Sequence, residues 1–151
     1  MLIRKAKPKD SDTLSNLAYK SKSYWGYSKD FLKRSKDDLT VTGEYIEQNP
    51  VYLMEKDNKI VAFYNFEVKN KKLEALFIDP DYIGKGIGKL LWLDLLGKAK
   101  ELNIKEFTLD SEPNAEGFYL KMGANKIGYT SSTVFPNRNL PLMKVKVMYH
   151  L

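Results

Sequence analysis

Cysteine is absent from this sequence of 151 residues, which excludes disulfide bonds, thiolate metal ligands and a cysteine nucleophile. Histidine occurs once, at His150, so a serine–histidine triad is not expected and a metal site built from several histidines is impossible. The longest uninterrupted apolar run, Ile60–Tyr64, is far shorter than the ~18 residues that cross a membrane. The charged residues of Met1–Pro8 argue against a secretory signal. We therefore expect a cytoplasmic protein with no metal site and no membrane contact.

The composition is typical of a globular protein, with 43% hydrophobic and 29% charged residues, and the length fits one domain spanning residues 1–151. The 25 Lys and Arg against 19 Asp and Glu give a net charge of +6, which attracts nucleic acid or a phosphorylated cofactor. No five consecutive residues are basic, so an arm dedicated to nucleic acid is not predicted. We expect no nucleic-acid partner.

Strand and helix patterns alternate along the chain, which indicates an α/β fold of the α+β type. Three strands joined by turn residues at Asp57-Asn58 and Asn70-Lys71 predict an antiparallel meander in the middle of the chain. The predicted strands are 2–5, 51–56, 59–69, 72–78, 106–109, 125–130 and 142–149. The predicted helices are 10–21, 28–38, 43–49, a long one ending near 102, and 115–122.

A glycine-rich segment joins the third meander strand to the long helix. Gly84, Gly86 and Gly88 alternate there, and such a turn can direct backbone N–H groups and the helix dipole at a phosphate. A Walker A loop is excluded because position 83 is Ile and position 90 is Leu. A dinucleotide fingerprint is excluded because position 89 is Lys.

This loop resembles the pyrophosphate-binding signature of the GNAT acetyltransferases, Arg/Gln-x-x-Gly-x-Gly/Ala, with Gly86 and Gly88 at the two small-residue positions. The sequence departs from the signature at Ile83, where the family has Arg or Gln. The segment Asn114–Ala124 resembles the family's late asparagine-to-tyrosine helix, so the resemblance extends over essentially the whole chain. It implies a mixed central sheet of six to seven largely antiparallel strands, flanked by about four helices.

The resemblance also implies a ligand, acetyl-CoA, as acyl donor. Asn114 would help to hold the pantetheine arm, and Tyr119 would face the thioester; the alternative for Tyr119 is a core residue whose hydroxyl finds a partner. The residues implied in cofactor binding are Phe77, Ile78, Ile83, Gly84, Lys85, Gly86, Ile87, Gly88, Lys89, Asn114 and Tyr119.

The implied reaction is acetyl transfer to a primary amine of a small molecule or peptide, by direct attack in a ternary complex. Because an alkylamine is mostly charged at neutral pH, a base or a water relay must take its proton. A strand period of two places Glu74 on the same face as Leu76 and Ile78, which predicts a carboxylate on a buried face and makes Glu74 the first candidate base. An edge-facing charge is the alternative, and Asp110 and Glu112 are second choices.

Tyr119 is the predicted acid for the departing thiolate, and the resemblance implies an oxyanion donor among the backbone N–H groups near Phe77 and Ile78. The predicted acceptor pocket has an aromatic wall of Tyr24, Trp25, Tyr27 and Phe135, with Arg138 as a clamp for a carboxylate. Core or turn residues and a solvated arginine are the alternative.

Two other functions stay open at this stage: a non-catalytic acyl-CoA sensor, and a nucleic-acid-binding domain that uses the positive charge. We expect a monomer or a homodimer.

Overall fold

The computed structural model describes residues 1–147. His150 and the end of the strand predicted to reach Tyr149 lie outside this range. In chain order the strands and α-helices are β1 (Leu2–Lys5), α1 (Ser11–Ser23), α2 (Lys29–Leu39), α3 (Gly43–Gln48), β2 (Val51–Lys56), β3 (Lys59–Glu67), β4 (Lys72–Ile78), α4 (Ile87–Glu101), β5 (Glu106–Asp110), α5 (Glu116–Lys121), β6 (Asn125–Ser131) and β7 (Asn139–Lys146). Three 3-10 turns, η1 (Pro8–Asp10), η2 (Pro80–Tyr82) and η3 (Pro113–Ala115), precede α1, α4 and α5.

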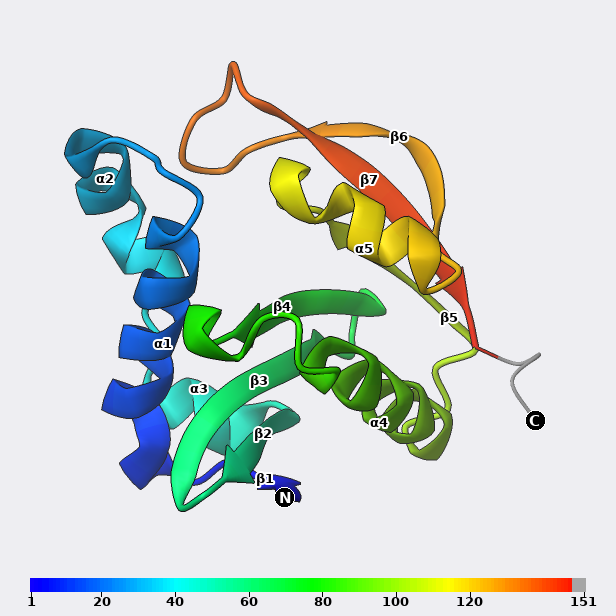
Figure 1. Ribbon diagram of the computed structural model, residues 1–151. Coiled ribbons are helices and arrows are strands. Elements are labelled where there is room, and N and C mark those ends of the chain that lie inside the picture. The colour runs from blue at the N-terminus through cyan, green and yellow to red at the C-terminus, as the bar shows by residue number, and fades with distance from the viewer. Residues whose placement is uncertain (148–151) are drawn as a thin grey trace.

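The strands of residues 1–147 form one sheet of seven strands in the order β1-β2-β3-β4-β5-β7-β6 (Figure 1). Every neighbouring pair is antiparallel except β4 and β5. The expected mixed, largely antiparallel sheet is therefore confirmed. The last strand begins earlier than predicted, at Asn139, and contains Pro141. Pro141 has no N–H to donate to the sheet, but its carbonyl accepts the Ser111 N–H at 2.8 Å.

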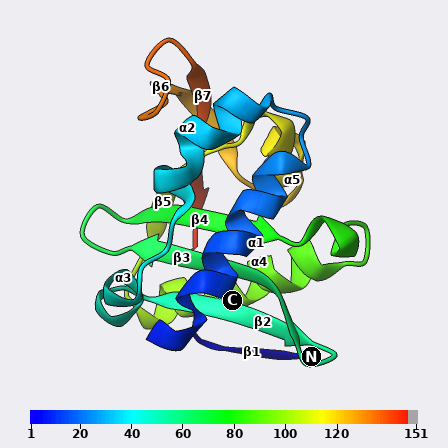
Figure 2. The ribbon, with the colours of Figure 1, turned by 90° about the vertical axis from the view of Figure 1, so that its left-hand side faces the viewer.

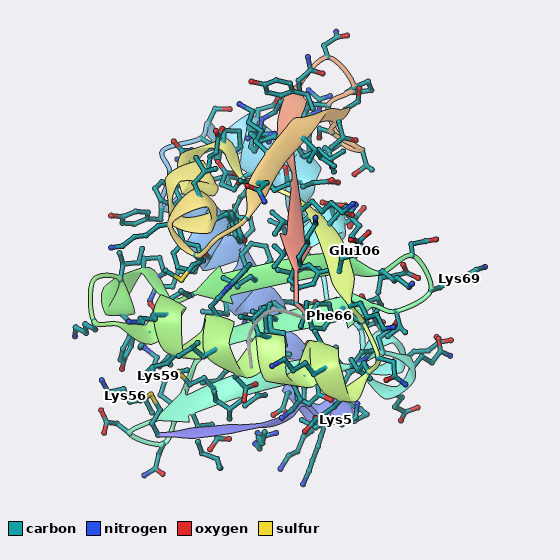
Figure 3. The ribbon with its side chains drawn as sticks, turned by 90° about the vertical axis from the view of Figure 1, so that its right-hand side faces the viewer. Lys5, Lys56, Lys59, Phe66, Lys69 and Glu106 are labelled. Carbon is teal, nitrogen blue, oxygen red and sulfur yellow. The ribbon has the colours of Figure 1, made fainter. Side chains whose placement is uncertain are left out.

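Helices cover both faces of the sheet. Figure 2 shows α1, α2 and α3 in front of one face, and α1 buries Leu14, Leu17 and Ala18 against β2 and β3. Figure 3 shows α4 and α5 in front of the opposite face, with Lys56 and Lys59 beside the β2–β3 turn. That face buries the larger core, in which Trp92 of α4 meets Phe107 of β5. None of the helices within residues 1–147 is long and apolar enough to cross a membrane.

The centre of the sheet is split between β4 and β5. These strands pair only at Lys72 and Thr108, where the Thr108 N–H donates to the Lys71 carbonyl at 3.1 Å, and then separate (Figure 1). Beyond Lys72, the β5-facing edge of β4 has no strand partner among the described residues. Free backbone groups and space for a ligand therefore occur together at the middle of the molecule.

Glu74 lies at a bulge in β4. Ala75 pairs with Asn65 and Leu73 pairs with the next residue, Phe66, so Glu74 has no partner of its own on β3. The extra residue breaks the period of two. Leu73, not Glu74, shares the α4 core with Leu76, and Glu74 is exposed. The expectation that Glu74 occupies a buried face is therefore wrong.

Candidate active site

The glycine-rich loop forms the start of α4. Gly86 is the N-cap residue with φ +79°, and Gly84 has φ +82°. Residues other than glycine rarely adopt this left-handed backbone conformation. The first N–H groups of an α-helix have no carbonyl acceptor within the helix. In α4 neither an N-cap side chain nor an acidic residue of the first turn takes the place of that acceptor. With Lys85 and Lys89 beside them, these groups fit a bound pyrophosphate.

The other two residues of this turn serve the packing of α4. Ile87 is 1% exposed and belongs to the core. A Cβ on Gly88 would lie 2.9 Å from Cε1 of Phe118 and 3.4 Å from Cδ1 of Ile78. Gly88 is thus required where α4 approaches α5, in addition to any approach to a phosphate that the sequence indicated.

Asp79 anchors the loop where it leaves β4. Its side chain is 3% exposed, accepts the Asp81 N–H at 2.9 Å, and pairs with Lys20 at 3.0 Å and Lys59 at 3.3 Å. Burial acts to raise the pKa of Asp79, but the Asp81 N–H and the two lysines outweigh it and hold the pKa below its ordinary value. The contact with Lys20 ties the loop to α1.

Two cavities meet where β4 and β5 separate. One, of about 200 Å³, is largely apolar and reaches the glycine loop at Ile83. The other, of about 240 Å³, is polar and lies between α2, β4 and the β6–β7 loop. The residues that line both cavities are Lys22, Leu76, Phe77, Glu112 and Tyr119.

Ile83, where the sequence departs from the family signature, lies in the wall of the apolar cavity. Ile83 lines it together with Trp25, Ile78 and Phe118, and it is 47% exposed. Among the predicted cofactor residues, Phe77 and Ile78 of β4 form its strand wall. A long polar side chain at position 83 would replace part of this apolar wall.

Tyr119 of α5 lies at the junction of the cavities. It is 7% exposed, and its ring packs against Phe118 and Trp92 at centroid distances of 5.3 and 5.9 Å. Its hydroxyl makes no hydrogen bond with any of residues 1–147. Burial, together with the nearby charge of Glu112, raises the pKa of Tyr119 well above its ordinary value. The side chain is therefore a core residue with a free, protonated hydroxyl at a cavity wall.

Glu112 is the centre of the polar network beside Tyr119. It accepts hydrogen bonds from Lys22 and Tyr27, from Asn114 Nδ2 at 2.8 Å, and pairs with Arg138 Nη2 at 3.5 Å. Burial acts to raise the pKa of Glu112, but the hydrogen bonds from Lys22, Tyr27 and Asn114 and the charge of Lys22 hold the pKa below its ordinary value. The sequence offered Glu112 only as a second choice for the base, because Lys22, Tyr27 and Arg138 lie far from it along the chain.

Arg138 and part of the predicted aromatic wall meet at this network. Tyr27 stacks on Phe31 at 4.2 Å and Phe31 on Phe135 at 4.5 Å between ring centroids. The Arg138 guanidinium lies 5.0 Å from the centroids of both Tyr27 and Phe31. Phe31, which sequence reasoning missed, completes the wall. The sequence could have indicated Phe31, because it lies in the first turn of the helix that Ser28 caps, close to Tyr27.

The other predicted aromatic residues lie apart from this stack. Tyr24 and Trp25 pack edge to face at 4.9 Å. Trp25 lines the apolar cavity, whereas Tyr24 lines neither cavity.

The predicted charged residues lie at the polar cavity. Arg138 is paired with Glu112, not solvated. Glu74 and Asp110 both line the polar cavity, where Asp110 pairs with Lys72 at 2.7 Å. Within residues 1–147, no group of three metal-ligating side chains is found.

Known proteins resemble this chain in sequence and in fold. Residues 17–134 match the model of a family described as an acetyltransferase (GNAT) domain. A stretch of 56 residues is 38% identical to glucosamine 6-phosphate N-acetyltransferase from Schizosaccharomyces pombe, covering 37% of this chain and 50% of that protein. The chain thus spans about half the length of this curated relative.

Solved structures share the fold at low identity. The PaiA N-acetyltransferase of Thermoplasma acidophilum, in complex with coenzyme A, has a TM-score of 0.78 and 22% identity, covering 96% of this chain and 98% of that chain. A GCN5-related N-acetyltransferase structure from Rhodopseudomonas palustris has a TM-score of 0.81 and 17% identity, covering 96% and 94%. Since the family model spans well over half of its residues, the chain belongs to the GNAT acetyltransferase family.

Proposed function

We propose that the protein transfers an acetyl group from acetyl-CoA to a primary amine of a small molecule or peptide, by direct attack in a ternary complex. The observation that carries this proposal is the junction of two cavities at Tyr119. An apolar cavity leads from the junction to a helix N-terminus suited to a pyrophosphate, and a polar cavity leads from it to the surface between α2 and the β6–β7 loop.

The donor side is supported by three features of this chain. The first turn of α4 with Lys85 and Lys89 would hold the pyrophosphate, and Ile83 and Phe118 would contact the pantetheine arm. When bound, acetyl-CoA supplies an activated acetyl group and a thiolate leaving group. The unpaired edge of β4 near Phe77 offers backbone N–H groups to a carbonyl oxygen.

The acceptor side must remove a proton, because an alkylamine with a pKa near ~10.4 is mostly charged at neutral pH. Lys22 and Arg138 share one carboxylate, Glu112, so one positive charge is in excess at the junction. That excess disfavours a protonated amine there. The proton leaves along the polar cavity to water. The Tyr119 hydroxyl is the proposed proton donor to the leaving thiolate.

Product mass spectrometry tests the function. The enzyme is incubated with acetyl-CoA and a pooled library of amines, and we expect an enzyme-dependent gain of one acetyl group on at least one amine. Binding of CoA without any acetylated product would favour an acyl-CoA sensor. Binding of duplex that weakens steeply with salt and that CoA does not compete for would favour a nucleic-acid-binding domain.

A further inference from the structure

Building on the proposed function, we propose that the acceptor is an aliphatic diamine whose second ammonium group binds Asp38 and Glu74 in the polar cavity. The proposal concerns the part of this cavity away from Tyr119. It follows from how the charges of the cavity wall are paired.

Most of the charged groups of the polar cavity neutralise one another. Lys72 pairs with Asp110 at 2.7 Å, and Lys22 and Arg138 both pair with Glu112. Every cation on the cavity wall therefore already has a carboxylate partner. The charged side chains that line the cavity are the cations Lys22, Lys72 and Arg138 and the carboxylates Asp38, Glu74, Asp110 and Glu112.

Among residues 1–147, the two remaining carboxylates pair with no cation. There, Asp38 of α2 accepts only a long hydrogen bond, 3.5 Å, from Thr133 Oγ1. Glu74 makes no hydrogen bond or ion pair with any residue in the range 1–147. The bulge in β4 turns Glu74 out of the α4 core, and Glu74 and Asp38 both line the polar cavity, from β4 and α2. This part of the cavity is thus suited to a cationic group of the ligand.

The opposite end of the cavity has the reverse polarity. There Glu112 is shared by two cations, and the buried Tyr119 hydroxyl faces the cavity without a partner in the described part of the chain. An amine entering this end is favoured as the neutral nucleophile, while a charged amine is favoured at Asp38 and Glu74. A diamine satisfies both ends in one orientation.

The spacing and lining of the cavity suit an alkyl chain between the two amines. Glu74 precedes Phe77 by three residues on β4, which corresponds to roughly 10 Å at the strand rise of ~3.3 Å per residue. The lining of the same cavity also includes the apolar side chains of Phe31, Leu76 and Leu140. Methylene groups can pack against this surface.

Steady-state kinetics with three acceptors of similar length test the proposal: diaminopentane, pentylamine and aminopentanoic acid. We expect kcat/KM to be highest for the diamine and lowest for the amino acid. The advantage of the diamine over pentylamine should be about threefold to thirtyfold at low salt, as two exposed ion pairs allow. It should shrink as the ionic strength rises.

Variants assign the preference to the two carboxylates. Asp38→Asn and Glu74→Gln should each reduce the ratio of kcat/KM between diaminopentane and pentylamine. Asp37→Asn is the matched control, because Asp37 is an exposed neighbour on α2 that lines neither cavity, and it should keep the wild-type ratio. If Glu74→Gln slowed all acceptors equally, Glu74 would be the base and its role as anchor would be overturned.

Equal or faster turnover of pentylamine, or a preference for aminopentanoic acid, would overturn the diamine proposal and leave acetyl transfer standing. If no amine were acetylated, the proposed function would fail. Calorimetric titration then decides the inference alone: tighter binding of diaminopentane than of pentylamine, lost in Asp38→Asn, would support it, and equal binding would refute it.

Discussion

At the scale of single residues, Tyr119 combines two roles that the sequence could not separate. Its ring belongs to the core beside Trp92, and its hydroxyl faces the junction of the two cavities without a partner among the described residues. A change that keeps the ring and removes the oxygen therefore separates packing from chemistry.

Tyr119→Phe is expected to lower kcat by about 10²- to 10⁴-fold, the usual contribution of a general acid, with CoA affinity within a few-fold of wild type. Tyr64→Phe is the matched control. Tyr64 is also buried, but its hydroxyl donates to Asp94 at 2.5 Å, so its loss should reduce stability by about 1 kcal/mol and leave kcat nearly unchanged. Wild-type turnover of Tyr119→Phe, with chemistry rate-limiting, would return Tyr119 to a structural role.

Glu112→Gln tests the network beside Tyr119. The amide keeps the shape but removes the charge that Lys22 and Arg138 share, so we expect the free energy of unfolding to fall by about 1–3 kcal/mol. Glu116→Gln provides the comparison, since Glu116 is 28% exposed and pairs with Lys126 at 3.4 Å; it should cost less than about 1 kcal/mol. Denaturant titration measures both. If the two variants lost equal free energy of unfolding, the charge of Glu112 would contribute no more to stability than that of an exposed glutamate.

At the scale of elements, a glycine that caps α4 and a glycine in its interior have opposite requirements. Gly86 is its N-cap with φ +79°, while Gly97 lies in its interior with no atom near an added Cβ. Backbone conformation, not available space, distinguishes them, because a Cβ on Gly86 also meets nothing within 4 Å.

Gly86→Ala should therefore destabilise the protein by about 1–2 kcal/mol and weaken CoA binding, since the turn that presents the helix N–H groups is strained. Gly97→Ala should stabilise it by about 0.5–1 kcal/mol without changing CoA affinity. Denaturant titration and calorimetry measure the two effects. A neutral Gly86→Ala would show that the turn relaxes without loss of function.

At the scale of the whole molecule, three ion-paired carboxylates join different elements of the fold. Asp10 pairs with Arg4 at 2.9 Å, Asp79 joins the loop after β4 to α1 and to the β2–β3 turn, and Glu112 joins α1 to the β6–β7 loop. Hydrogen bonds from Arg4 lower the pKa of Asp10, and the pKa values of Asp79 and Glu112 are also lowered.

A lowered pKa in the folded state means that the folded protein binds protons less readily than the unfolded chain. The stabilisation is fully present above the unfolded pKa values, ~3.9 for Asp and ~4.3 for Glu, and is lost as the pH falls through the lower folded values. We expect the free energy of unfolding to drop below about pH 4. Asp79→Asn should be less stable than wild type at neutral pH and should lose less on acidification. Parallel pH profiles would contradict this role of Asp79.

The sequence by itself determined the order of helices and strands, the glycine-rich start of α4 and the family. These depend on periodicity, turn residues and local spacing, which a short stretch of chain contains. Ser28, for example, caps α2 as predicted, accepting the Phe31 N–H at 3.1 Å.

Only the tertiary structure decided how the acceptor side is built. The bulge that exposes Glu74 depends on the register between β3 and β4, and the clash that forbids a side chain at Gly88 comes from α5. The hydrogen bonds from Tyr27 to Glu112 and from Arg138 to Tyr27 join residues 85 and 111 positions apart. Contacts over such separations follow from the packing of the whole sheet and its helices, so no local pattern in the sequence contains them.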